Sequence, residues 1–126
     1  MHKSKLCGFI IDCQTGDVGA AAAFWSAALG MPQRTLSGPE NEHYVGLDDP
    51  LGRLHVEVQQ VEHPSRVHLD IEADDVEAEV RRLEALGARR VRQVHSWWVL
   101  EAPTGQRFCV VRAQSADFAG VATTWP

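Results

Sequence analysis

The chain has 126 residues, of which 44% are hydrophobic and 23% charged, a composition typical of a soluble globular protein. Its net charge of -5 and its lack of a dense Lys/Arg run argue against nucleic acid as a partner. The first apolar run stops at Asp12, too short for a signal-peptide core or a membrane span. Three cysteines without CxxC spacing suit a reducing compartment. We therefore expect a single domain over 1–126, located in the cytoplasm and without a membrane partner.

The chain begins with a predicted strand and a predicted helix. Residues 5–13 are rich in β-branched and aromatic side chains, which is typical of a strand. Asp17 can cap a helix over 18–29, and the glycine that follows can end it. The helical spacing places Phe24 and Trp25 on one face, so we expect both in the core.

Further strands are predicted in the rest of the first half. Residues 31–47 predict one or two strands with a turn near 37–41. After a clear turn over 48–52, a run of alternating side chains predicts a half-buried strand. Its apolar face holds Leu54, Val56 and Val58, and its polar face holds His55, Glu57 and Gln59.

The second half opens on a similar alternating stretch. Val67, Leu69 and Ile71 point one way, and His68, Asp70 and Glu72 point the other. Asp74 is expected to cap the next helix, with Glu77 as its capping-box partner. That helix has an apolar stripe ending at Leu86. The segments 91–94, 97–100 and 107–112 predict further strands, and 114–126 is a tail.

The two halves repeat the same order of elements. Each has a strand, a capped helix that ends in Ala-Leu-Gly, two strands, a Pro-x-Gly turn and a last strand. One such βαβββ unit is too small to bury its own sheet. We therefore predict an α+β fold, with modules over about 5–62 and 65–113. These would form a curved mixed sheet around a cavity, with the helices on the outer face.

The alternation also predicts which side chains face the cavity. Apolar residues should face the helices and polar residues the concave side, unless a strand slips by one residue. Of the adjacent Trp97 and Trp98, one should face the cavity, where it can stack on a planar or cationic ligand. The other residues assigned to the cavity are Ile10, Asp12, His55, Glu57, Gln59, His68, Asp70, Arg107 and Cys109.

Four stretches together resemble the vicinal oxygen chelate superfamily, the glyoxalase/bleomycin-resistance/dioxygenase fold, and most closely its glyoxalase-like branch. The stretches are 23–30, 66–71, 86–88 and 97–111, and the resemblance extends over roughly residues 5 to 113. It is specific to the fold and much less so to an activity. The fold hosts lyases, isomerases, dioxygenases, transferases and non-catalytic drug-binding proteins.

The resemblance also implies where a metal would be bound. Metal-using members place ligands on the first and last strands of each module. Carried over position by position, these sites fall at Ile10, Gln59 (or Glu57), His68 and Cys109. Ile10 has no donor atom and Cys109 replaces the usual carboxylate, while three protein ligands are the usual minimum for a catalytic site. We therefore expect no metal and no other cofactor.

Several of the polar residues allow two interpretations. His68 is either held at the sheet surface by a hydrogen bond or lines a pocket, where its nitrogen can transfer protons. Cys109 is either a small buried side chain or a reactive thiolate near Arg107. His55 and Glu57 are either solvated or in the cavity, where a carboxylate can act as a general base. An acidic cavity would favour a cationic ligand.

Three functions remain open at this point. The first is a metal-independent lyase or isomerase, in which His68 and Glu57 handle protons on a small molecule held by Trp98 and Arg107. The second is a non-catalytic protein that sequesters a ligand, as bleomycin-resistance proteins do. The third is a partner-binding module. The resemblance also implies a homodimer. The expected ligand-binding residues are His55, Gln59, Asp70, Trp98, Arg107 and Cys109.

Overall fold

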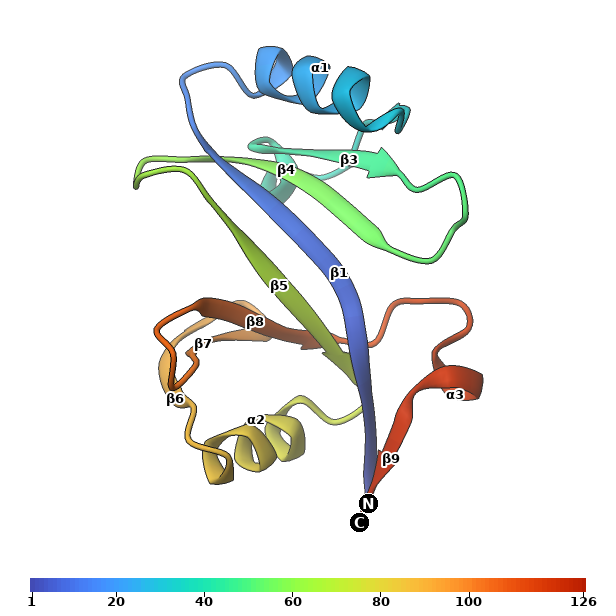
Figure 1. Ribbon diagram of the computed structural model, residues 1–126, viewed down its shortest axis with the longest axis vertical. Helices are drawn as coiled ribbons and strands as arrows, with labels where there is room; N and C mark the ends of the chain where they lie inside the picture. The colour runs from blue at the N-terminus through green and yellow to red at the C-terminus, as the bar shows by residue number, and fades with distance from the viewer. The chain divides into compact units, whose positions relative to one another are not determined.

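The computed structural model describes every residue from Met1 to Pro126 and contains nine strands and three α-helices (Figure 1). The chain forms two compact units. We call Gly8–Val67 the N-terminal module, and His68–Pro126 together with Met1–Cys7 the C-terminal module. The predicted α+β class is confirmed. No helix is long and apolar enough to cross a membrane.

The N-terminal module has the predicted βαβββ path. Its strands follow the order β2-β3-β4-β1, with β1 parallel to β4 and the other pairs antiparallel. Asp17 caps α1 by accepting a hydrogen bond from the Ala20 amide, and Gly30 ends the helix with φ of 68°. The elements are β1 (His2–Gln14), α1 (Val18–Leu29), β2 (Gln33–Arg34), a 3-10 turn (Pro39–Asn41), β3 (Tyr44–Asp48) and β4 (His55–Val61).

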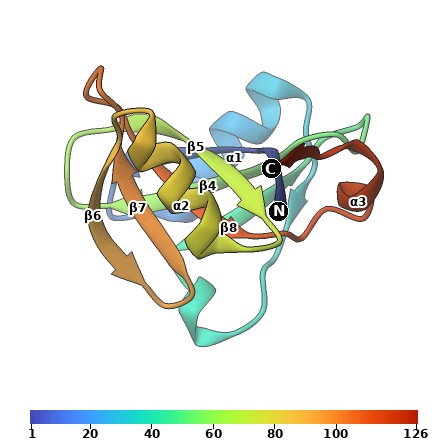
Figure 2. The same ribbon diagram turned by 90° about the horizontal axis from the view of Figure 1, so that it is seen from below.

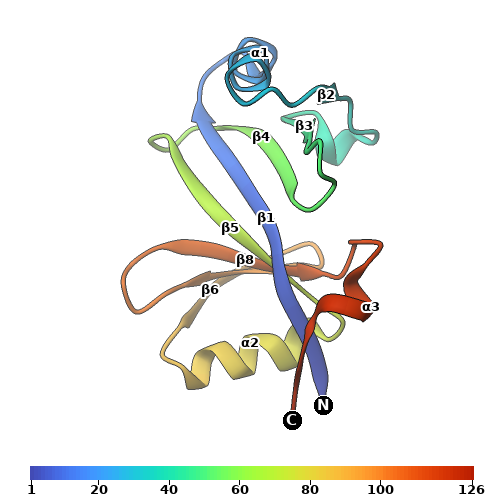
Figure 3. The same ribbon diagram turned by 45° about the vertical axis from the view of Figure 1, so that its right-hand side comes forward.

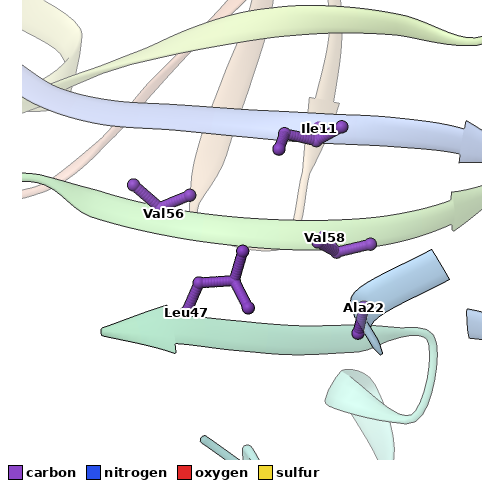
Figure 4. Packing of buried hydrophobic residues seen from close by; sticks show 5 residues of the cluster. All are labelled: Ile11, Ala22, Leu47, Val56 and Val58. Carbon is purple, nitrogen blue, oxygen red and sulfur yellow. The ribbon is translucent and has the colours of Figure 1, made fainter. Parts of the chain in front are cut away.

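The core of this module lies between α1 and the sheet. Helix α1 packs against β3 and β4, and its fully buried Ala22 permits the close approach (Figure 4). Trp25 packs against this core, but Phe24 is 62% exposed, so its predicted core position is wrong. Phe24 comes two residues after Ala22, which corresponds to a rotation of about 200° around the helix axis. Phe24 therefore points away from the side on which Ala22 is buried. The buried cluster is Ile11, Ala22, Leu47, Val56 and Val58.

The parallel pairing of β1 with β4 depends on a glycine. Gly8 lies opposite His55 in the register. A Cβ atom at this position would lie 1.8 Å from the His55 carbonyl oxygen. Only a residue without a side chain allows the two strands to approach so closely.

The C-terminal module repeats the same path. Its strands follow the order β5-β8-β7-β6, with β5 parallel to β8, so the predicted internal repeat is confirmed. Helix α2 lies across β8, β7 and β6 (Figure 2). The elements are β5 (Arg66–Ala73), α2 (Val76–Ala85), β6 (Arg89–Val94), β7 (Trp97–Glu101), β8 (Arg107–Arg112), α3 (Phe118–Val121) and β9 (Thr123–Trp125).

The cap of α2 differs from the prediction by one residue. Asp75, and not Asp74, accepts the hydrogen bond from the Ala78 amide. Asp74 instead accepts a hydrogen bond from the Lys3 amide at 2.8 Å. Glu77 does not close a capping box, because its carboxylate binds the Arg90 guanidinium. A distant backbone donor therefore decides which of two adjacent aspartates caps the helix.

The apolar side of β5 is not covered as predicted. Val67 is 59% and Leu69 is 52% exposed, because α2 packs on the other strands of the module. Leu86, the last residue of the expected helical stripe, is also exposed. The core that does form consists of Ala73, Val80, Leu100 and Val110. The polar side of β5 is the more buried side of its second half.

The tail forms secondary structure that was not predicted. Strand β9 pairs antiparallel with the start of β1, where Trp125 lies opposite His2 (Figure 3). The Trp125 indole donates a hydrogen bond to Ser4 and stacks on the Arg82 guanidinium, 3.7 Å from the ring centroid. Phe118 is buried. The tail is therefore an integral part of the C-terminal module.

Candidate functional site

Three of the predicted site residues converge in the C-terminal module. Asp70 on β5 lies opposite Cys109 on β8 in the parallel register. His68 lies two residues earlier on β5, so its side chain projects from the same face. The donor atoms of the three side chains all lie within 4.8 Å of one another. Sequence alternation assigned all three to one face, but it did not indicate that Asp70 would be the partner of His68.

The histidine and the aspartate of this cluster form a close pair. His68 Nε2 lies 3.5 Å from Asp70 Oδ1, and their side chains are only 15% and 10% exposed. Asp70 Oδ1 is buried and has no hydrogen bond. A buried carboxylate oxygen without a donor is uncommon, because desolvation is then uncompensated. The unsatisfied Asp70 oxygen therefore favours a ligand that donates a hydrogen bond beside His68.

The next polar residue on this face of β5 has a structural role. Glu72 is fully buried and accepts hydrogen bonds from the Gln114 and Ser115 amides and from the Ser115 hydroxyl. Burial alone would raise the pKa of Glu72, but hydrogen bonds from Cys7 and Ser115 hold it below its usual value. In turn, burial and the neighbouring Glu72 raise the pKa of the Cys7 thiol to about 12. Glu72 at this end of β5 therefore holds the start of the C-terminal tail, at Gln114 and Ser115, against the sheet.

A second polar group lies within the N-terminal module. His55 and Glu57, both on β4, form a hydrogen bond between their side chains. Gln59 donates its amide N–H to the Tyr44 hydroxyl at 2.9 Å. Both side chains of the His55–Glu57 pair are largely buried. Glu57, predicted as a second proton-transfer residue, is thus engaged by a histidine of its own strand.

The first strand contributes two residues to the same face. The β1–β4 register places Ile10 opposite Glu57 and Asp12 opposite Gln59. Asp12 is 2% exposed, and its Oδ2 lies 3.9 Å from the Arg66 Nε. Ile10 contributes a buried apolar surface beside these polar groups.

Trp98 does not lie on the face of His68 and Cys109, so its predicted place in that pocket is wrong. It lies opposite Val110 in the β7–β8 register and packs against the core under α2. Its ring also stacks on the Arg90 guanidinium, 4.8 Å from the centroid. Because side chains alternate along β7, Trp97 takes the face that was expected for Trp98.

Arg107 lies on the face of Cys109 but is held in an ion pair. Its Nε lies 3.2 Å from Glu101 Oε1, and Glu101 also binds Arg89. Both arginines hold the pKa of Glu101 below its usual value. Arg107 is therefore held at Glu101, a single carboxylate that it shares with Arg89.

A pocket of about 480 Å³ lies on the opposite face of the C-terminal module from His68. It is found at the start of α2, and Trp98 and Arg112 are among its lining residues. The others that shape it include Asp75, Val76, Gln93 and Ser96. Several elements and the turns between them line this pocket together, so strand alternation gave no signal for it. The convergence of titratable groups, and not this pocket, marks the candidate site.

The residues do not fit the metal centre that the resemblance implies. Of the implied positions, Ile10 has no donor atom, and the Gln59 amide is hydrogen-bonded to Tyr44. The cluster of His68, Asp70 and Cys109 shares only two of these positions, and its third member, Asp70, is already paired with His68. We therefore derive no step through a metal.

A family model described as a glyoxalase-like domain matches residues 8–111. The chain belongs to the glyoxalase-like domain family. The resemblance to the vicinal oxygen chelate superfamily is thereby confirmed. No curated protein sequence matches the chain at a significant level.

Solved structures show the same glyoxalase-like fold at low sequence identity. A hypothetical protein from Bacillus halodurans is similar with a TM-score of 0.64 and 11% identity, covering 90% of this chain and 97% of its own. Methylmalonyl-CoA epimerase from Mycobacterium tuberculosis has a TM-score of 0.64 and 16% identity, covering 86% and 88%. A variant of the Streptomyces coelicolor epimerase in complex with 2-nitronate-propionyl-CoA has a TM-score of 0.58 and 16% identity, covering 87% and 98%. At these identities the matches establish the fold alone.

Proposed function

We propose that this glyoxalase-like protein is an isomerase-type enzyme that removes and returns a proton on a small molecule. The observation that carries the proposal is the buried pair in which His68 Nε2 lies 3.5 Å from Asp70 Oδ1. A histidine with a carboxylate partner is suited to accept a proton near neutral pH and to give it back.

Asp70 has two tasks in this proposal. It orients the imidazole through Nε2, and its negative charge stabilises the imidazolium after proton removal. Because both side chains are largely buried, this attraction is stronger than it would be in water. The reaction needs no metal, and it does not require Glu57, which is bound to His55.

The comparisons support a particular class of substrate. The named neighbours include methylmalonyl-CoA epimerase, whose substrate is a branched acyl thioester. In such a compound the carbonyl group acidifies the neighbouring C–H bond, so a single well-placed base can exchange its proton. We therefore propose a substrate with a C–H bond next to a carbonyl, and we leave its remaining groups open.

Deuterium exchange tests this proposal. The protein is incubated in D2O with a panel of branched acyl thioesters and 2-substituted oxo acids, and mass spectrometry follows the gain of deuterium. We expect catalysed exchange with at least one compound. With His68→Asn the rate should fall at least about 100-fold, because general-base catalysis typically contributes that much or more. Circular dichroism checks that the variant is folded. Equal exchange by the wild type and a folded His68→Asn protein contradicts the proposal.

The same panel distinguishes the ligand-sequestering alternative. Such a protein would show a higher melting temperature with one class of compound, since a ligand that binds only the native state stabilises it. It would show no deuterium exchange with that compound. This combined result would replace the isomerase proposal with a non-catalytic one.

A further inference from the structure

The three cysteines lie in different chemical surroundings. Cys7 is fully buried beside Glu72, and the pKa of its thiol is raised to about 12. Cys13 is partly buried, and burial raises the pKa of its thiol as well. Cys109 is 8% exposed, and its Sγ is the one that shares a cluster with a histidine. Access alone would therefore rank Cys13 as the most reactive thiol.

The strand register explains why Cys109 differs. Asp70 and Cys109 are direct neighbours across β5 and β8, and His68 projects from the same face. A thiol, an imidazole and a carboxylate that lie together are the parts of a nucleophile, its base and the group that orients the base. Asp70 Oδ1, which is buried without a hydrogen bond, shows that this set is not a closed structural network. The Glu72 cluster, by contrast, is saturated with hydrogen bonds.

We propose that Cys109 is a nucleophile, activated by His68, that adds reversibly to conjugated carbonyl compounds. This inference goes beyond the proposed function, because it uses the same histidine but requires no exchange of a substrate proton. His68 takes the thiol proton, and Sγ forms a bond with the β-carbon of the C=C–C=O unit. The electrons of the C=C bond move to the carbonyl to give an enolate. The proton on His68 then passes to the α-carbon, so that the thioether adduct contains every atom of both reactants.

The surroundings of Cys109 favour this electrophile over an ester or an amide. Strand β8 lies between β5 and β7, so its backbone N–H groups belong to the sheet ladders. Acyl transfer needs free N–H donors beside the nucleophile to stabilise an oxyanion. Arg107 on the same face is paired with Glu101. Conjugate addition instead places the developing charge several atoms away from the sulfur.

N-ethylmaleimide, a conjugated imide, tests the inference on the full-length protein. After brief exposure at neutral pH, peptide mass spectrometry gives the rate of adduct formation at each cysteine. We expect Cys109 to react at least about tenfold faster than Cys13, and Cys7 to remain unmodified. If Cys13 reacts first, access governs reactivity and the proposal is overturned. This ranking is measured in the wild type, so it stands whether or not a variant folds.

His68→Asn separates a chemical role of the histidine from a packing role. Loss of the base should lower the rate at Cys109 about tenfold or more, with the rate at Cys13 unchanged as an internal reference. Loosened packing would do the opposite, because it would expose the thiol and raise its rate. A rate at Cys109 that is unchanged or higher in the variant overturns the proposal.

A chelator arm distinguishes thiol activation from metal binding. The wild-type protein is labelled before and after dialysis against EDTA. Equal rates at Cys109 support the proposal. A marked rise after chelation would show that Cys109 had been a metal ligand, and it would contradict the assignment of a free nucleophile. Because the readout is an adduct mass and not deuterium gain, failure here is distinct from failure of the isomerase proposal.

Discussion

The two modules follow the same backbone path but carry different chemistry at equivalent positions. Counted back from the first residue of the following helix, Ile10 in the N-terminal module corresponds to His68 in the C-terminal module. Asp12 corresponds to Asp70 in the same way. The strand registers then match Gln59 with Cys109. At these equivalent positions the repeat therefore preserves the backbone and the aspartate, while the histidine and the thiol stand in the C-terminal module only.

The two modules also differ in how their helices are held on the sheet. Helix α1 contains no charged residue and packs through small apolar side chains. Helix α2 carries Glu79, which is fully buried and binds His2, Ser4 and Arg82. The N-terminal module thus depends on close apolar packing, and the C-terminal module on a buried ionic network as well.

The largest expected effect tests the close packing of the N-terminal module. Gly8→Val would place side-chain atoms on the His55 carbonyl, so the β1–β4 pairing could not form without a shift of the backbone. We expect a loss of more than about 3 kcal/mol, beyond the range of ordinary substitutions, in chemical denaturation. Gly16→Ala is the matched control, because a Cβ atom there meets nothing within 4 Å. Similar losses for both variants would contradict this account of β1.

The second effect tests the ionic network of the C-terminal module. Glu79→Ala removes the acceptor shared by His2, Ser4 and Arg82, and leaves the buried His2 imidazole and the buried Ser4 hydroxyl without the carboxylate that they bind. We expect a loss of about 3 to 5 kcal/mol in the free energy of unfolding. The exposed Glu62 serves as a control, and Glu62→Ala should change stability by less than about 0.5 kcal/mol. A small effect of Glu79→Ala would show that the network contributes little.

A third prediction concerns acid. Burial alone would raise the pKa values of Glu72 and Glu79, but their hydrogen bonds hold both below the usual value in the folded protein. Their contribution to stability is therefore present above the unfolded pKa of about 4.3 and is lost as pH falls through the lower folded values. Amide hydrogen exchange should show the C-terminal module losing protection before the core of the N-terminal module. Loss in the reverse order would contradict this assignment.

The smallest effect tests the cap of α2. Asp75→Ala should cost about 1 kcal/mol and speed hydrogen exchange at the Ala78 amide, because the capping acceptor is removed. Asp74→Ala should speed exchange at the Lys3 amide and leave Ala78 unchanged. Exchange that responds in the opposite pattern would restore the capping position predicted from the sequence.

Local signals made much of this fold predictable from the sequence. Helix 18–29 was predicted with its correct bounds, because Asp17 and Gly30 act on the helix directly. Strand 107–112 was also correct, because side-chain alternation and a preceding turn define it locally. The repeat of elements then indicated the arrangement of strands within each module.

The errors arose where residues distant in sequence compete or combine. The choice between Asp74 and Asp75 depends on a backbone N–H near the N-terminus. The tail forms β9 because it meets β1 at the other end of the chain. Alternation placed His68 and Cys109 on one face, but which tryptophan joins them depends on the register between β7 and β8. No local pattern contains that information.

The central claim is that the chemistry resides in the C-terminal module. Deuterium exchange into an accepted compound, measured side by side for His68→Asn and His55→Asn, tests it most directly, because each variant removes the histidine that pairs with a carboxylate of its own strand in one module. We predict a loss of about 100-fold or more for His68→Asn, and a loss at least about tenfold smaller for His55→Asn. Equal losses, or a larger loss for His55→Asn, would contradict the claim.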